Sequence, residues 1–253
     1  MEGLTLSPSF ILLAGAATIF AGISKGGFGS GAAFVSSALL ALVIPPGQAL
    51  ALMLPLLMVM DIASLKPYWR KWDWPRSRLL ILSGVPGVFL GVLFFQAVDD
   101  DALRILIGVI SIGFVVWQIA WKIGSRLKFQ RSLGVVGGSI AGVLAGFSSF
   151  VSHAGGPPAA VYLLSNGMSK TQYQASTVLV FWVINIAKFV PYAWLGLITV
   201  NGLWANLFLV PVALLGTWIG VRLHYVISDA HFFFVTYVLL VFTGTNLIWG
   251  GLT

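Results

Sequence analysis

The chain has 253 residues, of which 58% are hydrophobic and only 8% are charged, and its formal net charge is +7. Because soluble globular domains carry about 25% charged residues, this composition excludes a water-facing shell and predicts an integral membrane protein. Cysteine is absent, which excludes disulfides, thiol catalysis and thiolate metal sites. The sequence also lacks an H-E-x-x-H motif for zinc chemistry, so we expect neither a metal site nor a cofactor.

The apolar segments predict an all-α polytopic membrane protein. A bilayer core requires about 20 apolar residues per helix, and the segments of this length are 4–24, 47–65, 79–98, 103–121, 133–151, 172–195, 201–221 and 231–250. The first segment lacks the basic start and the cleavage site of a signal peptide, so we expect a retained membrane helix. Two further pieces, 31–44 and 157–165, are too short to span comfortably. The sequence leaves open whether these two pieces span or re-enter.

The two halves of the sequence resemble each other. "DIASLKPY" at 61–68 matches "NIAKFVPY" at 185–192, and three further matches follow in the same order at nearly the same offset. This pattern predicts two transmembrane repeats, 1–124 and 125–253. Each repeat has five apolar segments and contains a broken helix or re-entrant hairpin. Since five is odd, the second copy is expected to be inverted relative to the first.

The distribution of basic residues sets the predicted orientation. Two short loops at 66–78 and 122–131 hold most of them, and aromatic residues interleave with the first loop. Such a patch could bind nucleic acid, but positive cytoplasmic loops and interfacial aromatics are the preferred interpretation, so no nucleic-acid partner is expected. Five segments per repeat put Lys25, Lys170 and Arg222 on the inside as well, together with both loops. Both chain termini are then periplasmic.

Two glycine-rich breaks, "SKGGFGSG" at 24–31 and "SHAGGPP" at 152–158, interrupt apolar sequence. Broken backbone survives in a bilayer only where protein or a water-filled cavity surrounds it, and paired breaks in inverted repeats are typical of secondary transporters. Free N–H groups at half-helix N-termini favour an anion. The alternative is that the glycines only allow close helix packing. The substrate-binding residues predicted in the breaks are Ser24, Gly26, Gly27, Gly29, Ser30, Ser149, Ser152, His153, Gly155 and Gly156.

The breaks and their flanking helices resemble those of the TauE/SafE family of sulfite and organosulfonate exporters, also called the toluene-sulfonate uptake permease family. The resemblance rests on "FAGISKGGFGSGAAFVSSALLALVIPP" and "LAGFSSFVSHAGGPPAAVYLLSNGMS", and it covers nearly the whole chain. It implies a multi-pass transporter of small sulfur-containing or carboxylate-like anions in the bacterial inner membrane. The second break departs from the family pattern, because His153 aligns with Gly26 and Pro158 with Gly31.

Polar residues at membrane depth complete the predicted site. We expect Lys188 to attract the anion, and Asp61 and His153 to serve in proton or charge coupling. The alternatives are that the lysine and the aspartate extend to nearby interfaces, and that the histidine only caps broken backbone. Gln48 and Gln174 occupy nearly matching positions in the two halves, where they could bind an oxyanion or cap helix starts.

Other functions remain as alternatives. The main one is transport of a different small organic anion. An intramembrane serine hydrolase could use Ser30 and His153, but the sequence has no G-x-S-x-G elbow, so we do not expect an enzyme. A partner-anchoring subunit and a cation channel are also disfavoured, because the loops are short and no acidic ring is evident. The expected partners are the small anion, the lipid bilayer and, as a possibility, a second copy of the chain.

Overall fold

The computed structural model describes residues 8–29, 32–124, 133–226 and 229–253. Within these residues it contains helices and no strands, and eight helices are long and apolar enough to cross a membrane. The elements are α1 (Pro8–Ile23), the π-helix η1 (Ser24–Phe28), α2 (Val35–Leu40), α3 (Pro46–Leu65), α4 (Trp74–Ala97), α5 (Asp100–Gly124), α6 (Val135–Ser152), α7 (Gly156–Ser165), α8 (Lys170–Trp194), α9 (Val200–Leu223) and α10 (Asp229–Leu252).

The eight spans coincide with the eight apolar segments expected from the sequence, which confirms the all-α membrane fold. The two short pieces form α2, with 6 residues, and α7, with 10 residues. A helix rises 1.5 Å per residue, so neither is long enough to cross a bilayer core of about 30 Å. Each is instead a short helix that follows a break.

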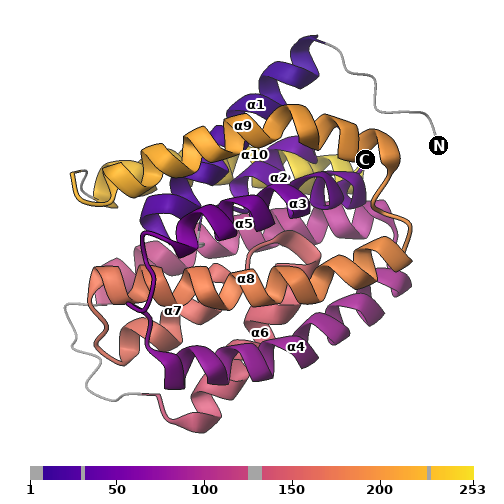
Figure 1. Ribbon diagram of the computed structural model, residues 1–253. Coiled ribbons are helices and arrows are strands. Elements are labelled where there is room, and N and C mark those ends of the chain that lie inside the picture. The colour runs from indigo at the N-terminus through magenta and orange to yellow at the C-terminus, as the bar shows by residue number, and fades with distance from the viewer. Residues whose placement is uncertain (1–7, 30–31, 125–132, 227–228) are drawn as a thin grey trace.

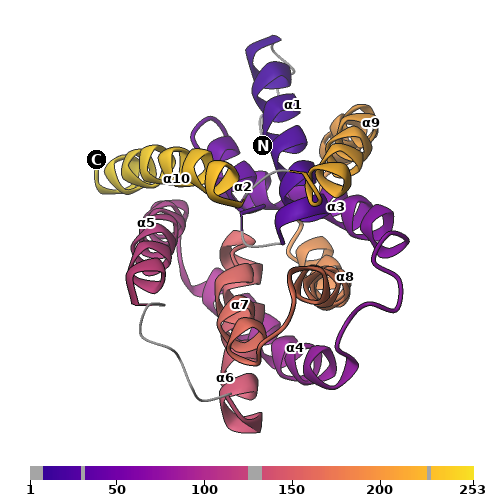
Figure 2. The same ribbon diagram turned by 90° about the vertical axis from the view of Figure 1, so that its left-hand side faces the viewer.

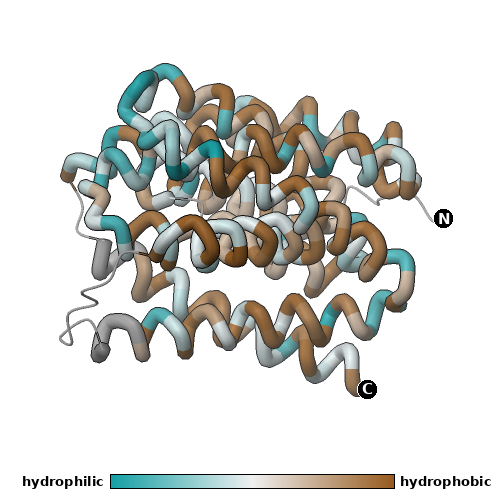
Figure 3. The backbone as a smooth tube through the Cα atoms, turned by 90° about the horizontal axis from the view of Figure 1, so that it is seen from below, coloured by the Kyte–Doolittle hydropathy of each residue, from teal (hydrophilic) through white to brown (hydrophobic). Residues whose placement is uncertain are grey.

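The spanning helices run side by side and form one bundle. The start of α1 and the end of α10 lie at one end, and the connection between α3 and α4 lies at the other (Figure 1). A view along the bundle shows three peripheral pairs, α1 with α9, α4 with α6 and α5 with α10 (Figure 2). Helices α3 and α8 contact each other and are the two most buried spans. Hydrophilic residues gather at the end opposite the termini, while hydrophobic residues cover the length of the helices (Figure 3).

The peripheral pairs pack through glycines. A Cβ atom added at Gly146 of α6 would collide with the backbone carbonyl of Gly84 in α4, and one added at Gly22 of α1 would lie 2.7 Å from the amide nitrogen of Thr217 in α9. Without a strong hydrophobic force between helices in lipid, close backbone approach provides the packing energy. The alternative interpretation of glycines as packing devices therefore holds for these positions outside the breaks.

We expect Gly146→Ala to lower the unfolding temperature in detergent, because the α4–α6 contact must separate, at a cost of about 1–3 kcal/mol. The matched control is Gly113→Ala in α5, where an added Cβ meets no atom within 4 Å. That control should unfold at the wild-type temperature or slightly above it, since alanine favours a helix over glycine by about 1 kcal/mol. Equal unfolding temperatures for the two variants would contradict the packing assignment.

Candidate functional site

The first break begins later than the sequence suggests. The helix that starts as α1 continues through the π-helical turn η1, and it ends at Gly29, whose φ of 82° is left-handed. This turn directs Lys25 into the protein, where the side chain is 2% exposed. The expectation that Lys25 belongs to a cytoplasmic loop is therefore wrong. The charge is tolerated at this depth because it has a buried partner.

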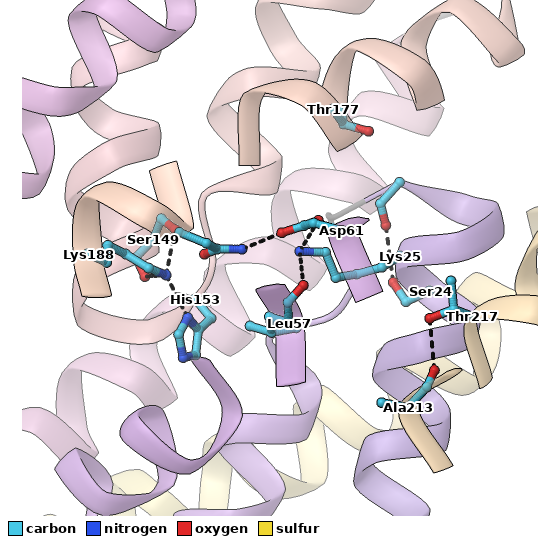
Figure 4. A network of polar contacts seen from close by, with 12 residues as sticks. Ser24, Lys25, Leu57, Asp61, Ser149, His153, Thr177, Lys188, Ala213 and Thr217 are labelled. Carbon is cyan, nitrogen blue, oxygen red and sulfur yellow. Dashed lines mark hydrogen bonds and ion pairs between the residues drawn. The ribbon is translucent and has the colours of Figure 1, made fainter. Parts of the chain in front are cut away.

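That partner is Asp61 on α3. The Lys25 ammonium lies 2.5 Å from one carboxylate oxygen of Asp61 and 3.5 Å from the carbonyl oxygen of Leu57. Asn185 on α8 donates its amide to the other carboxylate oxygen at 2.7 Å. The aspartate thus joins the first break to both central helices (Figure 4). It is fully buried and does not extend to an interface.

The second break has a histidine at its turn. Helix α6 ends at Ser152, and His153 adopts a left-handed conformation with φ of 58°. Its Nε2 lies 2.9 Å from the carbonyl oxygen of Leu50, and its Nδ1 lies 2.7 Å from Nζ of Lys188. Because a carbonyl oxygen can only accept, Nε2 carries a hydrogen, and in a neutral ring Nδ1 accepts from the lysine.

The ammonium of Lys188 on α8 is held by three acceptors. They are the carbonyl oxygen of Ser149 at 2.9 Å, the hydroxyl of the same serine at 3.0 Å and Nδ1 of His153. None of these groups is a carboxylate. With both lysines protonated, the cluster of Lys25, Lys188 and Asp61 therefore has a formal charge of +1. The arrangement brings both breaks together with α3 and α8 around two buried lysines and one buried carboxylate (Figure 4).

A cavity of about 310 Å³ lies at the end of the bundle where α8 begins. Its lining includes Gly27, Lys170, Tyr173, Gln174 and His224. The amide of Gln174 donates to the backbone carbonyl of Lys25 at 2.6 Å, so the lining of the cavity contacts the first break. A larger cavity of about 420 Å³ lies among α5, α6 and α7, but its lining is almost entirely apolar and does not suit an anion.

The remaining polar residues predicted for the site do not share one location. Ser24 Oγ donates to the Gly29 carbonyl in its own break, and Ser152 Oγ donates to the Ser148 carbonyl one turn earlier in α6. Gln48 lines a cavity of only about 10 Å³ together with Asn206. Ser30 lies outside the residues that the structure describes.

The glycines of the breaks contact protein rather than open space. Gly26 and Gly27 face the backbone of α9, Gly29 faces the ring of Tyr173, and a Cβ at Gly155 would lie 2.5 Å from the carbonyl oxygen of Ala145. Gly156 is buried as the first residue of α7. Close packing therefore accounts for these contacts, while Gly27 also lines the 310 Å³ cavity.

Two tyrosines that sequence reasoning left out of the site anchor the breaks. Tyr68 donates its hydroxyl to the carbonyl oxygen of Gly26 at 2.7 Å, and Tyr192 donates to the carbonyl oxygen of Phe150 at 2.5 Å. Both rings are fully buried. Burial raises the pKa of Tyr68, so its hydroxyl stays protonated and remains a donor. The match between "LKPY" and "FVPY" in the two halves was the signal for this pair.

Comparison with known proteins agrees with this architecture. A family model described as sulfite exporter TauE/SafE matches residues 14–247, which is nearly the whole chain. No curated protein and no solved structure matches the chain. The eight spans, the two broken helices and this match agree with the resemblance carried by the breaks, and the chain belongs to the sulfite exporter TauE/SafE family of membrane transporters.

Proposed function

We propose that the chain moves a small sulfite- or sulfonate-type anion across the bacterial inner membrane by alternating access, with the anion held near the two broken helices. The family consists of transporters and not enzymes, which confirms the expectation that the chain is not an enzyme. Transport of another small organic anion is compatible with the same site.

The buried cluster of two lysines and one carboxylate is the observation that carries this proposal. A charge inside a membrane protein is costly unless a partner compensates it. Asp61 neutralises Lys25, while Lys188 contacts only neutral groups through its hydrogen bonds. One bound monoanion would neutralise the cluster. We assign Lys188, Ser149 and His153 as its principal ligands, with Gln174 between the cluster and the cavity.

The inverted repeat remains part of the proposal and has structural support. The two tyrosine anchors join residues separated by 42 positions in both halves. In addition, each peripheral pair combines one helix from 1–124 with one from 125–253. Two halves that pack against each other through such pairs can rotate relative to each other around a central site. Motion of this kind is the usual basis of alternating access.

The cavities indicate which side is accessible in this conformation. The 310 Å³ cavity lies at the end that carries Lys170, which the positive-inside rule places in the cytoplasm. Beside Gln48, at the opposite end, the space of about 10 Å³ holds about one water. We therefore assign an inward-facing state, with the cavity as the cytoplasmic entrance.

The proposal is tested with purified protein in liposomes and a panel of sulfite, methanesulfonate, sulfoacetate and acetate. We expect saturable counterflow of at least one sulfur-containing anion and no sodium or potassium flux. Protein that unfolds cooperatively in detergent, and is therefore folded, but transports none of the panel would contradict the proposal. Empty liposomes provide the control for passive leakage.

A further inference from the structure

The contact between Lys188 and His153 has room for a single hydrogen. Two basic nitrogens lie 2.7 Å apart, so one must donate and the other must accept. Nε2 of the ring already faces the Leu50 carbonyl at 2.9 Å, and this carbonyl can only accept. The pair can therefore hold at most one positive charge, either on the lysine beside a neutral imidazole or on the imidazole beside a neutral lysine. A second proton would place two donors against each other.

The surroundings of this pair contain no carboxylate in contact with it among the described residues. From α8, Lys188 and the ring of Tyr192 face His153, and the tyrosine hydroxyl is committed to the Phe150 carbonyl. From η1, the charge of Lys25 acts on the imidazole across the cluster. From α3, Leu50 offers only its carbonyl, while Asp61 bonds to Asn185 and Lys25.

We propose that the Lys188–His153 pair couples anion transport to protons, so that one proton travels with each monoanion. This inference rests on the proposed function and adds its energy coupling. A second positive charge at the pair is unfavourable by itself, because the cluster is already positive and buried. An anion at Lys188 removes that penalty. By linkage, anion and proton therefore promote each other's binding.

Each transport cycle exchanges hydrogen-bond partners at His153 and Lys188, and it moves one proton with one anion. A proton from the aqueous side binds Nδ1 of His153, and the imidazolium then donates from both ring nitrogens. The ammonium of Lys188 loses this acceptor, and the released N–H donates to an oxygen of the anion. The formal charge of the cluster passes from +1 to +2 with the proton and returns to +1 with the anion. When the anion leaves on the other side, the proton leaves His153, and the lysine donates to Nδ1 again. The cycle moves no net charge.

The experiment measures accumulation of labelled methanesulfonate in proteoliposomes, because this sulfonate does not titrate near neutral pH. A pH gradient is imposed while potassium and valinomycin hold the membrane potential at zero. One proton per anion predicts about tenfold accumulation on the alkaline side for each unit of pH difference. A steady-state ratio depends on coupling and not on the active fraction of protein, provided that leakage is slow. A membrane potential imposed without a pH gradient should produce no accumulation.

The diagnostic variant is His153→Asn. Asparagine tolerates the left-handed conformation at this position and offers a neutral acceptor to the lysine, but it does not titrate. Because His153 is also an assigned ligand, counterflow without gradients should become slower. The steady-state accumulation ratio does not depend on this rate, and it should fall from about tenfold to one. His224→Asn is the matched control, because His224 is also buried and its Nδ1 bonds to a backbone carbonyl, that of Gly27. Its accumulation ratio should stay near tenfold, whatever its rate.

The outcomes separate the two proposals. Wild-type counterflow without pH-driven accumulation, or with accumulation on the acidic side, overturns proton coupling and leaves anion transport intact. Accumulation that persists in His153→Asn overturns the assignment of the proton to this pair. Absence of methanesulfonate counterflow together with absence of response to the whole panel overturns the proposed function itself. If His153→Asn does not fold, the accumulation ratio of His153→Gln is compared with that of the wild type in its place.

Discussion

Lys188→Gln is expected to weaken anion binding by about 100-fold. Glutamine keeps a donor near Ser149 and His153 but removes the ammonium, which is fully buried and surrounded by neutral acceptors. Loss of one member of a buried, hydrogen-bonded charge pair costs about 2–5 kcal/mol, and about 2.7 kcal/mol corresponds to 100-fold in affinity. The measurement is the concentration dependence of methanesulfonate counterflow, combined with ligand-induced shifts of the unfolding temperature.

The control for this prediction is Arg104→Gln. Arg104 is partly exposed at the start of α5, where its guanidinium lies 2.6 Å from the carboxylate of Asp101. Charges in such exposed pairs contribute at most about 1 kcal/mol to any interaction, so anion affinity should stay within about twofold of the wild type. Similar losses in the two variants would mean that diffuse surface charge, and not the buried lysine, attracts the anion.

Asp61→Asn is expected to destabilise the protein by about 3–5 kcal/mol, because it leaves the ammonium of Lys25 buried without a counter-charge. The double variant Lys25→Gln with Asp61→Asn removes both charges and should recover most of this loss. Unfolding in detergent, followed by a double-mutant cycle, measures the coupling between the two residues.

The coupling energy between Lys25 and Asp61 decides whether their ion pair stabilises the folded protein. If the two single substitutions add without interaction, Asp61 does not stabilise the protein through Lys25, and the assignment of the ion pair is wrong. Recovery of stability in the double variant, with anion transport still impaired, would indicate that the pair also serves the transport cycle. The accumulation ratio under a pH gradient then separates a coupling defect from a slower rate.

The sequence by itself determined the class of the protein, its eight spanning helices and the positions of two breaks. These features are local, since hydropathy depends on neighbouring residues and the breaks depend on glycine and proline. It also indicated Asp61, His153 and Lys188 as polar residues at membrane depth, because an ionisable side chain in an apolar segment is visible without a structure.

The tertiary structure alone decided which of these residues meet. The sequence predicts that Lys25 belongs to a cytoplasmic loop, yet the turn η1 places its side chain against Asp61. The contact of Lys188 with His153 joins α8 to the end of α6, and Gly27 faces α9 rather than open space. Such contacts join residues far apart in the chain. Helix packing sets their register, and local periodicity does not encode which faces of distant helices come together.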